Sequence, residues 1–71
     1  MSAKELIELA KIELSKGNAD SVHLANYILR DLDEVKDAGL TDLAWAIHQG
    51  TPHRNDVLGL IERLENYLKG S

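Results

Sequence analysis

Apolar residues recur every three or four positions along most of the chain, which is the spacing of one face of an α-helix. Three glycines interrupt this pattern, and each is followed closely by a residue that commonly caps a helix N-terminus. The pairs are Gly17 with Asn18, Gly39 with Thr41, and Gly50 with Thr51. No stretch of five or more residues alternates between apolar and polar side chains, so no β-strand is expected. The sequence therefore predicts an all-α fold: a compact bundle of four helices, arranged as two helical hairpins, in one domain over residues 1–71.

The first two predicted helices form the first hairpin. One is expected over residues 2–16, where Ser2 and Glu5 match the Ser-x-x-Glu capping box. Its core-facing stripe is expected to contain Leu6, Leu9 and Ala10, flanked by Ile7 and Leu14. Ile12 lies off this stripe. The second helix is the longest, over residues 19–38, and its apolar stripe is broad.

The second predicted hairpin joins a short helix to a long one. The short helix is expected over residues 42–49, after an N-cap at Thr41. The long helix is expected to start with Thr51 as N-cap and Pro52 as its first helical residue. Gly59 lies inside this helix at a cost of about 1 kcal/mol relative to alanine. It either permits a close approach between helices or is simply tolerated.

Composition limits the possible chemistry. The chain has 71 residues and no cysteine, which excludes disulfides and thiolate metal sites. Hydrophobic residues make up 44% of it, enough to form a core. No apolar run approaches the roughly 20 residues of a membrane span. The N-terminal segment alternates charges with leucines, unlike a signal peptide. We therefore expect a cytoplasmic protein that does not interact with membranes.

The negative charge is concentrated in one segment. The net charge is −4, and residues 31–42 account for all of it, because positive and negative residues balance on either side. The acidic residues of this segment are Asp31, Asp33, Glu34, Asp37 and Asp42. Most of them would lie in the C-terminal half of the predicted second helix, where each opposes the helix macrodipole by roughly 0.3–1 kcal/mol. Broken local rules often mark functional sites, so this segment is either a docking patch for a basic partner or a solvated face.

Trp45 is the only tryptophan and follows the acidic segment closely. Tryptophan is enriched among the residues that dominate binding energy in protein interfaces. It projects away from the side of the short helix that carries Leu43 and Ile47. In a chain without phenylalanine, burial in the core is the more common outcome for such a ring, and contact with a partner is the alternative.

Catalytic and metal-binding motifs are absent from the sequence. His23, His48 and His53 match no ligand spacing, and no nucleophile or phosphate-binding motif is present. An EF-hand register from Asp31 places Val35 and Lys36 where an oxygen ligand and a glycine are required. We therefore expect a protein that is not an enzyme and needs no cofactor or metal.

Three functions remain open. The leading hypothesis is a small acidic protein-binding module: an inhibitor, an immunity or antitoxin-type factor, an anti-CRISPR-like factor, or an adaptor. It would dock on a basic surface of a larger protein through the acidic residues and Trp45. The second is a helix-turn-helix regulator that presents His53, Arg54 and Asn55 to DNA, although the acidic balance makes nucleic-acid binding a poor fit. The third is a structural homodimer in which the stripes of the second and fourth helices pair between chains.

Overall fold

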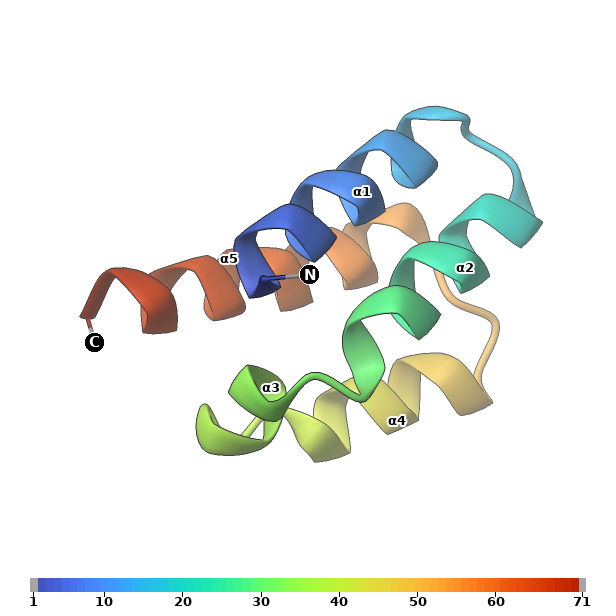
Figure 1. Ribbon diagram of the computed structural model, residues 1–71. Helices are drawn as coiled ribbons and strands as arrows, with labels where there is room; N and C mark the ends of the chain where they lie inside the picture. The colour runs from blue at the N-terminus through green and yellow to red at the C-terminus, as the bar shows by residue number, and fades with distance from the viewer. Residues whose placement is uncertain (1, 71) are drawn as a thin grey trace.

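The computed structural model describes residues 2–70, which form five helices and no strand (Figure 1). The helices are α1 (Ala3–Ser15), α2 (Ala19–Arg30), α3 (Asp33–Asp37), α4 (Thr41–Gln49) and α5 (Arg54–Gly70). The all-α prediction is confirmed. The predicted number of helices differs from the observed one, because the expected second helix is divided into α2 and α3.

The first hairpin begins and turns as its capping residues predict. The Ser2 hydroxyl accepts a hydrogen bond from the Glu5 backbone N–H (3.2 Å), and the Glu5 carboxylate accepts one from the Ser2 N–H (3.2 Å). Gly17 adopts a left-handed conformation (φ 78°) after α1. The Asn18 side chain then caps α2 by accepting from the Ser21 N–H (2.8 Å). These contacts confirm the predicted start and end of this turn, after which α2 returns alongside α1 (Figure 1).

The core-facing side of α1 differs from the prediction. Ala3, Ile7, Ala10 and Leu14 are buried, whereas Leu9 is exposed, so its expected place in the core was wrong. Ile12 is exposed as expected. Two stripes offset by part of a turn fit the helical period of this segment equally well. Packing against α2 and α5 selects the stripe that contains Ile7 and Leu14.

The break between α2 and α3 is the largest departure from the predicted elements. Asp31 ends α2 with φ −98° and ψ 8°, and Leu32 is extended with φ −64° and ψ 139°. The chain then turns into α3, whose Val35 is fully buried in the core and which packs against α5. The change of direction brings Val35 onto α5, so tertiary packing overrides a periodicity that would continue one long helix.

The starts of α4 and α5 also differ from the prediction. Thr41 is the first residue of α4 and not its N-cap, and the N-cap position is held by Leu40 without a side-chain hydrogen bond. Helix α5 begins at Arg54, so Thr51 and Pro52 belong to the connection. Residues 50–53 form a linker between the two helices, within which Gly50 has φ −90° and not the left-handed conformation expected.

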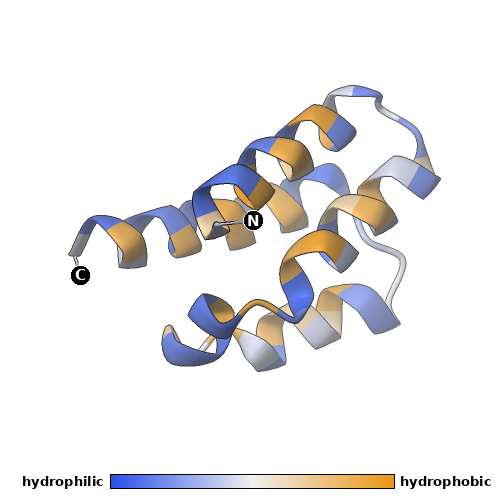
Figure 2. Cartoon of the chain, viewed as in Figure 1, coloured by the Kyte–Doolittle hydropathy of each residue, from blue (hydrophilic) through white to orange (hydrophobic). Residues whose placement is uncertain are grey.

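Helix α5 packs its apolar stripe against the other helices, so that orange segments face the interior in Figure 2. The buried cluster draws on every helix: Ile7, Ala10, Leu14, Val22, Ala25, Leu29, Val35, Ala44, Ile47, Val57, Leu60, Ile61 and Leu64. A Cβ at Gly59 would meet only the Arg63 side chain, at 3.1 Å from Nη1, so this glycine is tolerated and does not mediate a close helix approach. Among residues 2–70, no helix combines the length and apolar character needed to cross a membrane.

Candidate functional site: an aromatic and acidic surface on α2 and α4

Trp45 lies at the surface where α4 meets α2, with 39% of the residue exposed. The guanidinium carbon of Arg30, in the last turn of α2, is 4.2 Å from the centre of the Trp45 ring and 4.9 Å from that of Tyr27. Both distances are within the range of a cation–π contact. Tyr27 is itself 56% exposed. The expected burial of Trp45 in the core was therefore wrong, and its ring helps to form an aromatic surface.

Arg30 also contacts the first acidic residue of the segment. Its Nη2 and Nε atoms lie 3.4 Å from the two carboxylate oxygens of Asp31. Side-chain exposure is 12% for Arg30 and 68% for Asp31, so the guanidinium is largely covered while the carboxylate faces solvent. These bonds are long for charge-assisted contacts, which usually measure about 2.7–2.9 Å. The two rings therefore cover the guanidinium, and Asp31 contributes only weakly to holding it.

His48 supports the ring of Trp45 from within α4. The two rings meet edge to face, with their centres 5.6 Å apart. Behind them, the Asn26 amide of α2 donates a hydrogen bond to the Ala44 carbonyl of α4 (3.0 Å), and Asn26 is fully buried. The buried Asn26 Oδ1 and His48 Nδ1 atoms have no hydrogen-bond partner among the described residues. The Asn26 bond ties α2 to α4 and so positions Trp45 against Arg30.

The structure divides the predicted acidic patch. Asp42 lies three residues before Trp45 on α4, so the two share one side of that helix. Asp31 joins the same surface through Arg30. Asp33 and Asp37 are exposed on α3, one turn apart. We define the aromatic–acidic surface as Tyr27, Arg30, Asp31, Asp42 and Trp45.

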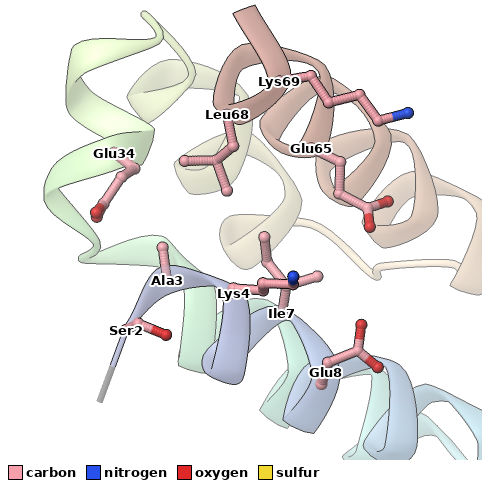
Figure 3. Close-up of a pocket in the computed structure, with 9 residues that line it drawn as sticks. All are labelled: Ser2, Ala3, Lys4, Ile7, Glu8, Glu34, Glu65, Leu68 and Lys69. Carbon is pink, nitrogen blue, oxygen red and sulfur yellow. The ribbon is translucent and has the colours of Figure 1, made fainter. Parts of the chain in front are cut away.

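Glu34 belongs to a different part of the molecule. It lines an open groove of about 520 Å³ between α3, the start of α1 and the end of α5, together with Lys4 and Lys69 (Figure 3). Ala3 and Ile7 supply part of the apolar lining. Glu34 therefore faces this groove, and its part in a docking patch with Trp45 stays a prediction.

The expected conflict with the helix macrodipole was also wrong for part of the segment. Asp33 and Glu34 occupy the first turn of α3, where a negative charge is favourable. Asp42 occupies the first turn of α4, in agreement with its predicted place at the start of the short helix. The helix start created by the break after α2 thus accommodates Asp33 and Glu34, which a single long helix would disfavour.

The residues of the DNA-binding alternative lie apart from this surface along the chain. His53, Arg54 and Asn55 are all exposed where α5 begins. The His53 backbone N–H donates to the Asp56 carboxylate (3.1 Å), which places a negative charge next to them. Residues 2–70 contain no group of three or more histidine, aspartate and glutamate side chains arranged to hold a metal ion.

Sequence reasoning missed two members of the aromatic–acidic surface, Tyr27 and Arg30, and also His48, which contacts Trp45. Tyr27 and Arg30 were detectable as neighbours, because residues three apart lie on one side of a helix. The contact of Arg30 with Trp45 spans two helices and had no sequence signal, and the same holds for the place of His48 against Trp45. The chain matches no known protein family, curated protein or solved structure.

Proposed function

We propose that this protein is a small binding module that docks on a basic surface of a larger protein through its aromatic–acidic surface. The observation that carries the proposal is the exposed pair of rings, Tyr27 and Trp45, stacked on Arg30 and bordered by two carboxylates. Large exposed aromatic rings beside charged groups are typical of the residues that dominate protein–protein affinity. An inhibitor, an immunity or antitoxin-type factor, an anti-CRISPR-like factor or an adaptor would act in this way.

The two kinds of residue have separate roles in the proposed interface. Tyr27 and Trp45 would provide apolar contact area, since each is partly exposed in the free protein. Asp31 and Asp42 would attract a positively charged partner and raise the rate of association, together with the exposed Asp33 and Asp37 on α3. The interaction should therefore weaken as salt screens these charges.

The two alternatives have less support. The apolar stripes of α2 and α5 are buried within the single chain, so the homodimer expected from pairing these stripes would require the core to open. A helix-turn-helix role for His53, Arg54 and Asn55 stays a prediction. Residues 43–71 offer few cations for phosphate contacts, and their positive charges are balanced by an equal number of acidic residues.

Charge reversal on and off the surface tests the proposal. Asp42→Lys changes the site, and Glu62→Lys makes the same change of charge at an exposed position on α5. A partner captured by the wild type should be captured equally by Glu62→Lys. Its recovery should fall about tenfold or more with Asp42→Lys and with Trp45→Ala, because interface hot spots contribute about 2 kcal/mol or more.

The readout is quantitative mass spectrometry of proteins bound to each immobilised variant, after circular dichroism has shown that each variant is folded. The captured partner should also elute as salt is raised. Equal recovery by all four proteins would refute the proposed surface. Retention on duplex DNA that is lost in Arg54→Ala would instead favour the helix-turn-helix alternative.

A further inference from the structure

The two rings of the aromatic–acidic surface already hold a cation of the chain itself, the Arg30 guanidinium. The Arg30 guanidinium carbon is 4.2 Å from the Trp45 ring centre and 4.9 Å from the Tyr27 ring centre. Its side chain is only 12% exposed, although both rings remain partly open to solvent. Two aromatic rings beside a carboxylate are the chemistry that recognises a guanidinium group, because the rings offer negative faces and the carboxylate offers a paired acceptor.

Arg30 is weakly attached to this site apart from the rings. Its polar contact is with the adjacent Asp31, where both N···O distances are 3.4 Å. The arginine side chain has a long flexible stem, so the guanidinium can leave the rings without a change in the backbone. Arg30 also lies in the last turn of α2, where a positive charge is favourable even when the side chain points into water.

We propose that Tyr27 and Trp45 form a binding site for an arginine side chain of the partner protein, and that Arg30 is an internal occupant which this arginine displaces. The inference rests on the proposed function and specifies how the partner is recognised. The incoming guanidinium would take the place of Arg30 over both rings and pair with Asp31, which Arg30 releases. Asp42, on the same side of α4 as Trp45, provides a second carboxylate at the edge of the site.

The exchange replaces one guanidinium by another, so the incoming group stacks on the same two rings that Arg30 leaves. Displaced Arg30 becomes hydrated, and the Asp31 carboxylate that it releases becomes available to the partner. Arginine fits better than lysine, because its planar group stacks on aromatic faces and is less strongly hydrated than an ammonium. The internal occupant lowers the apparent affinity of any ligand, since a ligand must compete with Arg30 in order to bind.

A capped peptide with a single arginine tests this inference without any partner. The probe is acetyl-Gly-Arg-Gly-amide at constant ionic strength, and the reporter is the fluorescence of Trp45, the only tryptophan in the chain. Arg30→Ala empties the site and should bind the peptide saturably, at least about threefold more tightly than the wild type, because it removes a competing cation–π contact. The lysine peptide should bind less tightly than the arginine peptide.

Arg63→Ala is the matched control, since it removes the same charge from an exposed position on α5. It should bind the peptide as weakly as the wild type. Equal affinities of Arg30→Ala and Arg63→Ala, or no saturable binding by Arg30→Ala, would overturn the inference. If Arg30→Ala does not fold, the NMR resonance of the Arg30 Nε–H group in the wild type tests the displacement instead. It should move toward its solvent-exposed position as the peptide is added, and an unchanged resonance at saturation would refute displacement.

This experiment fails independently of the capture experiment. If the arginine peptide does not bind but capture of a partner still depends on Trp45 and Asp42, the binding module stands and the cation exchange does not. If the peptide binds and no capture depends on this surface, the arginine site stands and the docking function does not.

Discussion

Leu24 and Leu29 have opposite environments on the same helix. Leu29 is fully buried in the core, whereas Leu24 is 45% exposed. Five residues turn a helix by about 140°, so the two side chains leave α2 on different sides. Comparing the two positions isolates the effect of burial on stability, because the residue type and the helix are the same at both.

We predict that Leu29→Ala lowers the free energy of unfolding by about 2–5 kcal/mol, since it removes buried contacts and leaves a cavity. Leu24→Ala should lower it by less than about 1 kcal/mol. Urea denaturation followed by circular dichroism measures both values. The first loss would be a large part of the total stability of so small a domain, which we expect to be on the order of 4–10 kcal/mol. Losses of similar size in the two variants would contradict the position of α2 in the core.

At the scale of the elements, two glycines serve different purposes. Gly39 connects α3 to α4 in a left-handed conformation, with φ 73°. Gly59 lies inside α5, and a Cβ there would contact only the flexible end of the Arg63 side chain. The first glycine is required by the backbone of the turn, and the second lowers the helix propensity of α5 without providing a contact that needs it.

Alanine substitutions at the two glycines should therefore have effects of opposite sign. Gly39→Ala should destabilise the protein by about 1–2 kcal/mol, because a Cβ is strained in the left-handed region. Gly59→Ala should stabilise it by about 0.5–1 kcal/mol, provided that the Arg63 guanidinium shifts by a few tenths of an ångström. Each kcal/mol moves the melting temperature of such a domain by about 4–8 °C, which calorimetry resolves. A lower melting temperature for Gly59→Ala would show that Arg63 cannot give way.

At the scale of the whole molecule, one ion pair connects the first helix to the last. Lys11 Nζ on α1 lies 2.9 Å from the Glu65 carboxylate on α5 and 3.5 Å from that of Glu8. The hydrogen bond to Glu65 is the main cause that raises the pKa of Lys11 above its ordinary value of 10.5. A lysine whose pKa is higher in the folded than in the unfolded protein stabilises the folded state. This contribution is complete at pH values below the unfolded pKa, and it is lost as the pH rises through the folded pKa.

We expect Glu65→Gln to reduce the loss of folding stability that occurs as the pH becomes alkaline. Between about pH 8 and about pH 11, the free energy of unfolding should fall more in the wild type than in this variant, because only the wild type loses a charged Lys11–Glu65 pair. Urea denaturation across this range gives the two slopes, and Glu62→Gln on the same helix serves as the control. Added salt should reduce the difference, since both side chains are partly exposed. Identical slopes in all three proteins would exclude a contribution from the pair.

The sequence by itself determined the features that depend on near neighbours along the chain. These include the all-helical fold, the Ser2–Glu5 capping box, the cap at Asn18 and the left-handed turns at Gly17 and Gly39. Each involves residues within a few positions of one another, so the local pattern contains the information.

The tertiary structure decided the rest, because those features depend on contacts between helices. The burial of Val35 against α5 accompanies a break that helical periodicity does not show, and packing of α1 selects Ile7 over Leu9 for the core. The candidate site has the same origin. The net charge of residues 31–42 was visible in the sequence, but the place of Glu34 in the groove and the contact of Asp31 with Arg30 beside Trp45 were not. Trp45 meets Arg30 only because α4 packs beside α2.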